Sequence, residues 1–373
     1  MLNLSSNSIS TGLVTNFDKN NNNGRRLMVK ALIINRSKPG NKQADALRFL
    51  KLIKTLKKGG INASYHDIET KNKLLDLLAR EQPEIVYCAN YFVTDEDGGL
   101  VNAHALLDQL GVCRVGSTVN SLELVLSKSA LKKQWVQDQV STPRFFVINK
   151  INDQERGLET ALQAADYPYI LKPDLEGNSR GLDSSSVVFD EESFINKTHS
   201  LLERYEKVMV EKFLNSSADF HEYTVGLIGG RRHQILMPTE IQLKQKKRVR
   251  LITTADKEQH RTQTVPVKGK VLREKLSGFA KQAFSSAGVS DYARLDMIMA
   301  NGALYAIEIN GLPMIPDKWF EACAKGVRLS EDQYLNAIFL SCILRNQAKA
   351  KKIRVPVEMR RMLPQQVFAS LGA

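Results

Sequence analysis

Apolar and polar positions alternate regularly over residues 28–116. Short apolar runs typical of buried strands are separated by segments with apolar residues at helical spacing. This alternation predicts a small Rossmann-like parallel sheet with helices on both faces. Gly59-Gly60 closes the first helix. The expected strands are Val29–Asn35, Ile61–His66, Glu84–Ala89 and a short Cys113–Gly116, and the expected helices are Gln43–Lys58, Asn72–Arg80 and Ala103–Leu110.

The remaining chain mixes strands and helices less regularly, which predicts an α+β arrangement. Ser117–Gln139 is mainly helical, and Ser141-Thr142-Pro143 prevents the helix from continuing. Ser330 and Gln333 form a capping box for a last helix that ends near Ile343. The other expected helices are Leu158–Ala165 and Val271–Phe284, and the expected strands are Phe145–Ile148, one that starts at Tyr169, Val208–Leu214, Tyr223–Ile228 and Leu236–Leu243.

The stretch Asp291–Pro313 reads as a hairpin with polar side chains inside apolar strands. Asn301-Gly302 is a strong turn signal between its two runs. Residues two apart in a strand share a face, so an in-register pairing would gather the polar groups on one surface. Such hard oxygen ligands suit Mg²⁺, whereas the alternative is a half-buried strand pair with solvated charges. The polar residues are Arg294, Asp296, Glu308 and Asn310.

Composition places the chain among globular proteins and narrows its partners. It has 373 residues, 43% of them hydrophobic, and no apolar run near the ~18 residues of a membrane span. The net charge of +13 suits anionic ligands. Histidines show no metal-ligand spacing, and the four cysteines predict buried reduced thiols in a cytoplasmic protein. These cysteines are Cys88, Cys113, Cys323 and Cys342.

Several segments lack a buried-core pattern. Residues 1–27 are Ser- and Asn-rich and are expected to be disordered, as a loose tail before a start at Met28 or, alternatively, as a transit peptide. Lys244–Lys270 is polar and basic, and is either a solvated loop or a lid over an anionic ligand. The loop after Lys172 carries Gly177 and Gly181, and either cradles phosphates or simply joins two strands.

Taken in order, these motifs resemble the ATP-grasp superfamily, and within it D-alanine–D-alanine ligases, over residues 28–343. The resemblance rests on motifs that recur in the same sequence order. They are EDG (96–98), GVCRVGS (111–117), SKSALKK (127–133) where relatives carry Asp-Lys, LKP with EGNSRG (171–181), VEKFL (210–214), EYTV (222–225), and ARLDM with EINGLP (293–313).

The resemblance implies an ATP-dependent carboxylate–amine ligase that forms an acyl phosphate and then an amide bond. Lys128 and Lys172 would hold phosphates, together with Glu176, Gly177, Asn178 and Ser179 of the loop. Adenine would meet Glu211, Lys212, Phe213 and Leu214, and ribose would meet Glu222. Asp296, Glu308 and Asn310 would hold one or two Mg²⁺ ions, with Mn²⁺ as an alternative. Arg294, Lys172 and Asn310 would be catalytic, and Lys257 would enter from the lid.

The substrate half departs from these relatives. The segment 35–47 lacks the Glu that positions the first D-alanine, and the lid lacks the Tyr-rich motif. After Pro313 the chain reads MIPDKWF (314–320) in place of the run that receives the acceptor's carboxylate. We therefore expect altered amino-acid or peptide substrates, an anionic one being favoured by the basic lid. The substrate candidates are Glu96, Met314, Lys318 and Trp319.

Two other functions compete with this hypothesis. One is a genuine D-alanine–D-alanine ligase of cell-wall synthesis. The other is a degenerate module that binds nucleotide or nucleic acid, although the basic loop lacks the interleaved aromatic residues that nucleic-acid binding favours. We expect small-molecule partners, a homodimer by resemblance, and neither membrane nor nucleic acid. The expected units are a tail (1–27), a Rossmann-like domain (28–116), a central ATP-grasp subdomain (117–207), a C-terminal subdomain with the metal site (208–347) and a basic tail (348–373).

Overall fold

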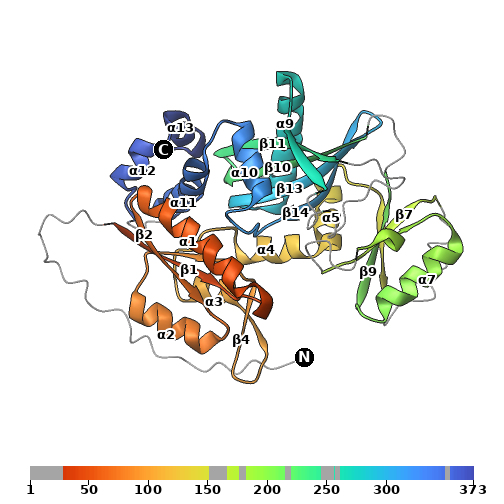
Figure 1. Ribbon diagram of the computed structural model, residues 1–373. Coiled ribbons are helices and arrows are strands. Elements are labelled where there is room, and N and C mark those ends of the chain that lie inside the picture. The colour runs from red at the N-terminus through yellow and green to blue at the C-terminus, as the bar shows by residue number, and fades with distance from the viewer. Residues whose placement is uncertain are drawn as a thin grey trace, which may run out of the picture.

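The N-terminal unit is the predicted parallel sheet with helices on both faces (Figure 1). The computed structural model describes residues 28–150, 166–175, 182–214, 220–244, 256, 261–348 and 353–373. The strands lie in the order β2-β1-β3, with α1 on one face and α2 and α3 on the other. Their bounds are β1 Val29–Asn35, α1 Lys42–Lys58, β2 Ile61–Asp67, α2 Lys71–Glu81, β3 Ile85–Cys88 and α3 Ala103–Gln109.

Two details of this unit differ from the prediction. The expected strand Cys113–Gly116 is reduced to a single bridge between Val86 and Arg114. The polar segment Tyr91–Gly99 after β3 has the composition of a loop, but with the residues that follow it forms a short hairpin of β4 (Phe92–Thr94) and β5 (Leu100–Asn102). This hairpin projects from the lower end of the unit in Figure 1.

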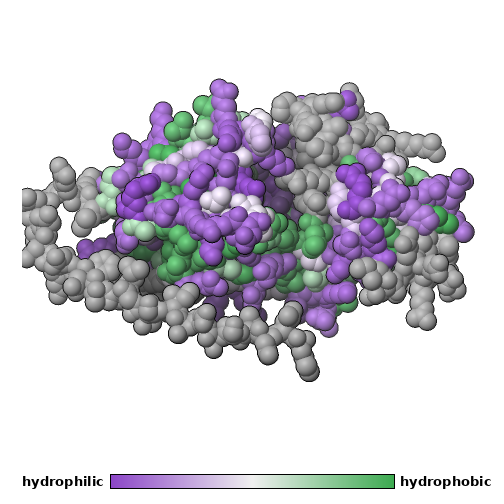
Figure 2. Space-filling model, turned by 90° about the horizontal axis from the view of Figure 1, so that it is seen from below, coloured by the Kyte–Doolittle hydropathy of each residue, from purple (hydrophilic) through white to green (hydrophobic). Residues whose placement is uncertain are grey.

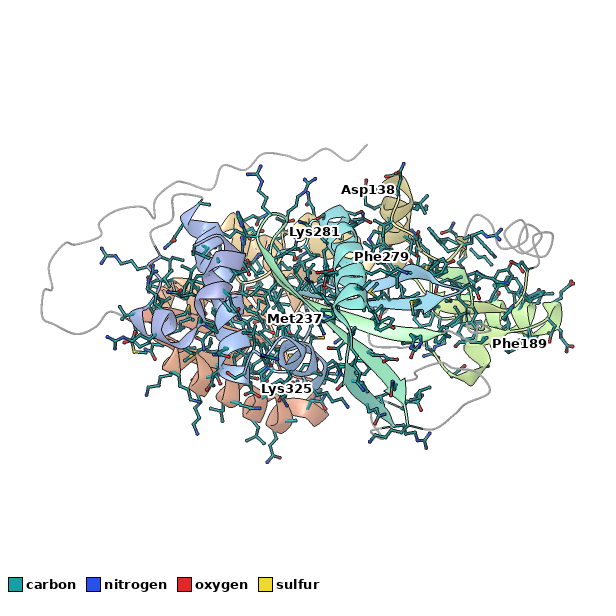
Figure 3. The ribbon with its side chains drawn as sticks, turned by 90° about the horizontal axis from the view of Figure 1, so that it is seen from above. Asp138, Phe189, Met237, Phe279, Lys281 and Lys325 are labelled. Atoms are coloured by element: carbon teal, nitrogen blue, oxygen red, sulfur yellow. The ribbon has the colours of Figure 1, made fainter. Side chains whose placement is uncertain are left out.

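A five-stranded antiparallel sheet forms the centre of the molecule, in the order β12-β11-β10-β13-β14. Alternate residues of β10 and β13, such as Val225 and Leu295, pack into a core with α9. The intervening residues, including Thr224 and Arg294, lie on the opposite face. Figure 3 labels Phe279 and Lys281 on α9 and Met237 on β11. The bounds are β10 His221–Gly229, β11 Gln234–Leu243, β12 Thr262–Pro266, α9 Lys270–Ala287, β13 Asp291–Ala300 and β14 Ala303–Asn310.

A four-stranded sheet forms a separate unit with a hydrophobic core of its own. Its strands lie in the order β6-β9-β7-β8, and α7 packs against them. The expected helix Leu158–Ala165 lies outside the described residues. The bounds are β6 Phe145–Asn149, β7 Tyr169–Pro173, β8 Val187–Val188, α7 Glu191–Leu202 and β9 Lys207–Lys212.

The segment before β6 packs its apolar residues with the five-stranded sheet, and polar contacts at Asp174 and Glu211 join it to this unit. It forms two helices, α4 (Val119–Leu126) and α5 (Lys128–Gln137), rather than one. Leu131 and Trp135 of α5 are buried in the core of the five-stranded sheet. We expected these helices within the 117–207 subdomain. They pack with the larger sheet instead, because the apolar face of α5 is buried in the same core as α9.

The C-terminal segment is ordered, contrary to the expectation of a loosely packed tail. Residues 353–373 contain α12 (Val357–Met362) and α13 (Gln365–Leu371). Met359 and Val367 are buried in the core that also contains α10 (Lys318–Gly326) and α11 (Glu331–Gln347). The segment is basic on its exposed side, but its apolar residues recur at helical spacing, and that pattern decides the packing.

Two expectations from composition can be compared with the structure. All four cysteines are buried and free, as predicted. In the described parts of the chain, no helix has the length and apolar character needed to cross a bilayer. Figure 2 shows one face of the molecule, on which hydrophilic side chains surround a middle band of hydrophobic ones.

Candidate active site

The β13–β14 hairpin brings the four predicted polar residues into direct opposition. Arg294 pairs with Asn310, and Asp296 pairs with Glu308. The two-residue turn has positive φ at both Asn301 (52°) and Gly302 (74°), as a type I′ turn requires.

A bulge in β14 makes this opposition possible. Near the turn the pairing is regular, with Met297 opposite Ala306. Continued regularly, it would place Asp296 opposite Ile307 and turn Glu308 to the other face. The register instead shifts between Asp296 and Met297, so that Ile307 is the extra residue. Both carboxylates therefore share one face of the sheet.

Hydrogen bonds hold the β13 end of this group in place. Thr224 on β10 donates its hydroxyl proton to Asp296 Oδ1 over 2.7 Å. Arg294 Nε lies 3.3 Å from the same oxygen, and Arg294 Nη1 lies 3.3 Å from Asp317 Oδ2. Burial alone would lower the pKa of Arg294, but Asp296 and Asp317 outweigh it and raise that pKa above its ordinary value. Arg294 is thus a fixed, fully charged group.

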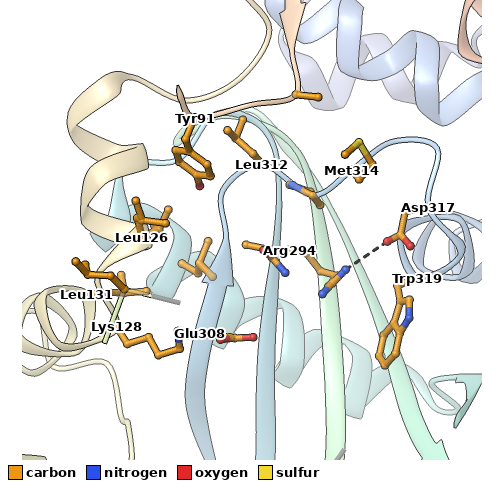
Figure 4. Close-up of a pocket in the computed structure, with 16 residues that line it drawn as sticks. Tyr91, Leu126, Lys128, Leu131, Arg294, Glu308, Leu312, Met314, Asp317 and Trp319 are labelled. Atoms are coloured by element: carbon orange, nitrogen blue, oxygen red, sulfur yellow. Dashed lines mark hydrogen bonds and ion pairs between the residues drawn. The ribbon is translucent and has the colours of Figure 1, made fainter. Parts of the chain in front are cut away.

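A cavity of about 480 Å³ opens beside the hairpin (Figure 4). We call it the larger cavity. It contains Lys128 and Arg294 as cationic groups and Glu308 and Asp317 as carboxylates, within a mostly apolar wall. The lining residues are Ala89, Tyr91, Val125, Leu126, Lys128, Leu131, Leu175, Arg294, Glu308, Ile309, Asn310, Leu312, Pro313, Met314, Asp317 and Trp319.

A smaller pocket of about 90 Å³ lies farther along the same face of the sheet, towards the hairpin turn, because Ile298, which lines it, shares the face of Arg294 and Asp296. It gathers all the described residues that we predicted for adenine and ribose, together with Lys172. Apolar side chains supply most of the remaining wall, as a flat base requires. Its lining residues are Pro143, Ile170, Lys172, Glu211, Lys212, Phe213, Leu214, Phe220, Glu222, Ile298 and Ile307.

Glu211 lies between two lysines at this pocket. Its Oε1 is 2.9 Å from Lys172 Nζ, and its Oε2 is 2.6 Å from Lys132 Nζ. Burial favours the neutral acid, but the two ammonium groups outweigh it and lower the pKa of Glu211. Burial also lowers the pKa of Lys132, against the opposing effect of Glu211. Sequence reasoning missed Lys132, although it lies one helical turn after Lys128 on the apolar face of α5.

A buried carboxylate also fixes the start of α5, which carries Lys128. Asp174, just after β7, accepts hydrogen bonds from Ser129 N at 2.7 Å, Ser127 Oγ at 2.9 Å and Ser129 Oγ at 3.0 Å. Its own backbone carbonyl accepts from Lys128 N. A carboxylate at a helix N-terminus is favourable. Relatives carry Asp where this chain has Ser127, and here Asp174 supplies the acidic group from the facing loop.

The hairpin residues fit a divalent cation. Across the described ranges, no cluster of three or more His, Cys, Asp or Glu residues has metal-ligand spacing. The candidate set is therefore Asp296 and Glu308, paired across the strands, with the Asn310 amide oxygen on the same face. Two carboxylates and few further protein ligands suit Mg²⁺, which usually retains waters and binds phosphate oxygens.

The structure does not place two of the predicted substrate residues in the larger cavity. Glu96 lies in the exposed β4–β5 turn and bonds to Asn72. Lys318 is exposed and is not among the residues lining the cavity, whereas its neighbours Asp317 and Trp319 both line it. Asp317 and Tyr91 were missed, because sequence alone does not show which side of a helix start or strand end faces a cavity. Five predicted residues, Glu176, Gly177, Asn178, Ser179 and Lys257, lie outside the described residues.

The sequence is similar to those of known D-alanine–D-alanine ligases. Residues 135–320 match the family model described as the C-terminus of D-ala D-ala ligase. The D-alanine–D-alanine ligase of Syntrophotalea carbinolica is 25% identical over 286 residues, which cover 75% of this chain and 85% of that protein. The corresponding ligase of Thermotoga petrophila is 25% identical over 299 residues, which cover 80% and 92% of the two chains.

Solved structures resemble the fold over most of its length. The D-alanine–D-alanine ligase of Bacillus anthracis complexed with ATP superposes with a TM-score of 0.68 at 18% identity. The match covers 87% of this chain and all of that one. The VanG D-Ala:D-Ser ligase of Enterococcus faecalis gives a TM-score of 0.65 at 15% identity, over 85% of this chain and all of that one.

Proposed function

The chain belongs to the ATP-grasp superfamily and is a D-alanine–D-alanine ligase-like, ATP-dependent carbon–nitrogen ligase, and on this premise we propose that its substrates are not two D-alanines. One substrate is a small carboxylic acid and the other is an amine. The reaction forms an amide bond and releases ADP and phosphate. The observation that carries this proposal is the opposition of Arg294, Asp296, Glu308 and Asn310 beside Lys128.

The residues divide the work between the two pockets. Glu211, Phe213, Leu214 and Glu222 hold the nucleoside in the smaller pocket, together with the backbone of Lys212. The Lys212 ammonium itself is turned to Asp166, at 2.8 Å. Lys172 and Lys128 hold phosphates as point charges at the edges of the two pockets. When Lys172 binds phosphate, its contact with Glu211 breaks. The contact between Lys132 and Glu211 remains and keeps that carboxylate neutralised.

Asp296, Glu308 and Asn310 would hold Mg²⁺, which neutralises phosphate charge when bound. Arg294 contacts the carboxylate that attacks the γ-phosphate and stabilises the negative oxygen of the tetrahedral intermediate after the amine attacks. Met314 lines the cavity, and its backbone N–H is the second donor that we assign to this oxygen. The chemistry needs positioned charge rather than a protein nucleophile.

The altered substrates are supported by the wall of the larger cavity. The missing Glu of segment 35–47 has no replacement at that place, and Asp317 and Trp319 stand where relatives receive the acceptor's carboxylate. The similar fold of a D-Ala:D-Ser ligase is consistent with substrate variation on this scaffold. A homodimer and a cytoplasmic location remain part of the proposal by resemblance.

A screen for ADP release tests this function. D- and L-amino acids and dipeptides are supplied with ATP and Mg²⁺, and release is expected with a pair other than two D-alanines. Release with D-alanine alone would show a genuine D-alanine–D-alanine ligase. No substrate-dependent release, together with salt-sensitive RNA binding, would support the non-enzyme alternative.

The hairpin ligands provide the matching mutational prediction. Asp296→Ala and Glu308→Ala should each lower kcat at least 100-fold, because each removes a carboxylate from the cation site. The melting temperature should change little in Glu308→Ala, whose side chain is partly exposed, and should fall in Asp296→Ala, which also removes a partner of the buried Arg294 and Thr224. Lys275→Ala, at an exposed contact with the carbonyl of Gly302 at the turn, is the control and should keep full activity. Unchanged turnover in both ligand variants would contradict the metal assignment.

A further inference from the structure

Asp317 occupies a helix N-cap but does not cap the helix. It precedes α10 with extended backbone angles, and its side chain makes no capping hydrogen bond. Aspartate is among the preferred N-cap residues, and such caps typically contribute about 1 kcal/mol. The carboxylate instead turns to Arg294, 3.3 Å away, and lines the larger cavity (Figure 4). The Asp317 carboxylate therefore faces the larger cavity instead of capping α10.

Trp319 completes this part of the wall. Its ring lies 5.5 Å from the Arg294 guanidinium carbon and lines the same cavity. Aromatic faces attract cations, and a carboxylate beside the ring adds to that attraction. Lys318, between the two, is exposed and outside the lining. The wall therefore presents a carboxylate and an aromatic face, both beside Arg294, where we had expected a lysine to bind a carboxylate.

The charges of the larger cavity leave one group without a role in the proposed mechanism. Its charged lining residues are Lys128, Arg294, Glu308 and Asp317. In the proposed mechanism Lys128 binds phosphate, Arg294 contacts the reacting acyl group, and Glu308 holds the cation. Asp317 is the remaining one, and its carboxylate directly contacts the residue that we place at the acyl oxygen. An amine that attacks the acyl carbon must approach this region.

We propose that Asp317 and Trp319 bind the amine substrate as its ammonium ion, and that this substrate is a cationic amine without an adjacent carboxylate. Asp317 accepts the ammonium proton, so that the free amine attacks the acyl carbon and phosphate leaves. A carboxylate on the acceptor would be placed near Asp317 and repelled, whereas an ammonium is attracted by both groups. This inference rests on the proposed function and names the class of its second substrate.

Hydroxylamine separates the two halves of the reaction. It is uncharged at neutral pH and intercepts an acyl phosphate to give a hydroxamate, so it reports carboxylate activation without needing an ammonium site. D- and L-amino acids are first screened as donors by this assay. Alanine and alaninamide, in both enantiomers, are then compared as acceptors, with kcat/KM calculated on the concentration of free amine, because the amide differs at the carboxyl end and also has a less basic amino group. Wild-type kcat/KM is expected to be at least tenfold higher with alaninamide.

Asp317→Asn is the decisive variant. It should lower kcat/KM with alaninamide at least tenfold, and so reduce the ratio of kcat/KM for alaninamide to kcat/KM for alanine. The rate of hydroxamate formation should stay within about threefold of wild type. Asp317→Ser, which retains a good N-cap residue, should behave alike if the first variant folds poorly. Glu321→Gln removes an equal charge from an exposed pair with Lys325 on the same helix and should change none of these values.

Three results would overturn the inference. Equal losses of hydroxamate and alaninamide turnover in Asp317→Asn would mean that Asp317 only orients Arg294. A wild-type preference for alanine would mean that the acceptor's carboxylate is bound. Absence of hydroxamate with every donor would overturn the proposed function and this inference with it, whereas the first two results would leave that function intact.

Discussion

At the scale of single residues, the candidate site depends on buried charges that are held by partners far away in the sequence. Lys132 has no exposed surface, and its ammonium contacts Glu211, the Thr142 hydroxyl at 2.5 Å and the Ala306 carbonyl at 3.4 Å. A lysine in a helix is normally solvated, so its burial could not be predicted from α5 alone. Lys128, Lys172 and Glu211 were predicted by motif, because each lies in a short, ordered sequence signature.

Removing the Lys132 charge should destabilise the protein strongly. Lys132→Met leaves Glu211 buried with one lysine fewer, and breaking such a buried pair typically costs about 3–5 kcal/mol. Urea denaturation of this variant is compared with that of Lys133→Met, whose side chain is exposed and whose unfolding free energy should change by less than about 0.5 kcal/mol. Equal stabilities of the two variants would refute the role of the Lys132–Glu211 pair.

The same pair predicts a dependence on pH. The pKa of Glu211 is lower in the folded than in the unfolded chain, so its stabilising effect is present above the ordinary carboxyl pKa and is lost as pH falls through the lowered value. The difference in unfolding free energy between wild type and Glu211→Gln should therefore be constant near neutrality and shrink on acidification below about pH 4.5. A difference that grows in acid would contradict the assignment.

At the scale of elements, sequence reasoning captured most strands, the hairpin turn and most helices. It missed the short strands β4, β5 and β8, and also β12, which lies inside the expected basic loop Lys244–Lys270. Asn301-Gly302 predicted the hairpin because only a few dipeptides favour positive φ at both positions. The bulge at Ile307 was not predicted, because its position depends on packing at both ends of β14 and has no local signature. Sequence analysis could therefore say only that Asp296 and Glu308 would meet if the strands paired in register. The observed strand register shows that they do.

Deleting Ile307 tests what the bulge does. Without this residue the regular pairing continues from Met297–Ala306 to Asp296–Glu308, so the two carboxylates stay opposed. The smaller pocket, however, loses one apolar wall. We expect KM for ATP to rise about tenfold while the activity keeps its dependence on Mg²⁺. Ile307→Ala should give a smaller rise in the same direction, and loss of the Mg²⁺ dependence in the deletion variant would contradict this account of the register.

At the scale of the whole molecule, the expected domain boundaries do not coincide with the hydrophobic cores. One core joins β1 and β3 of the parallel sheet to α11 and the C-terminal helices. Tyr87 on β3 lies 6.0 Å from Tyr292 on β13 and 6.4 Å from Phe339 on α11, measured between ring centres. Periodicity predicts which face of a helix is buried but not which distant element covers it, so this fusion could not be foreseen.

The C-terminal helices should contribute substantially to this shared core. Met359 is fully buried there, and Met359→Ala is expected to lower the unfolding free energy by about 2–5 kcal/mol. Arg360→Ala, at the next and exposed position, should change it by less than about 0.5 kcal/mol. Thermal and urea denaturation measure both. Equal unfolding free energies for the two variants would indicate that the C-terminal segment is a loosely packed tail.

The separate core of the four-stranded sheet has a consequence for motion. The parallel sheet, the five-stranded sheet and the C-terminal helices share buried side chains, so we expect them to move together. The β6-β9-β7-β8 unit packs around its own apolar residues, and Figure 3 places Phe189 of this unit at the far end of the molecule. A hinge rotation of that unit alone would change the distance between Lys172 and the cation ligands on β14. We therefore expect opening and closing around the nucleotide to move this unit relative to the substrate wall, and to strain the Glu211–Lys132 contact that joins it to α5.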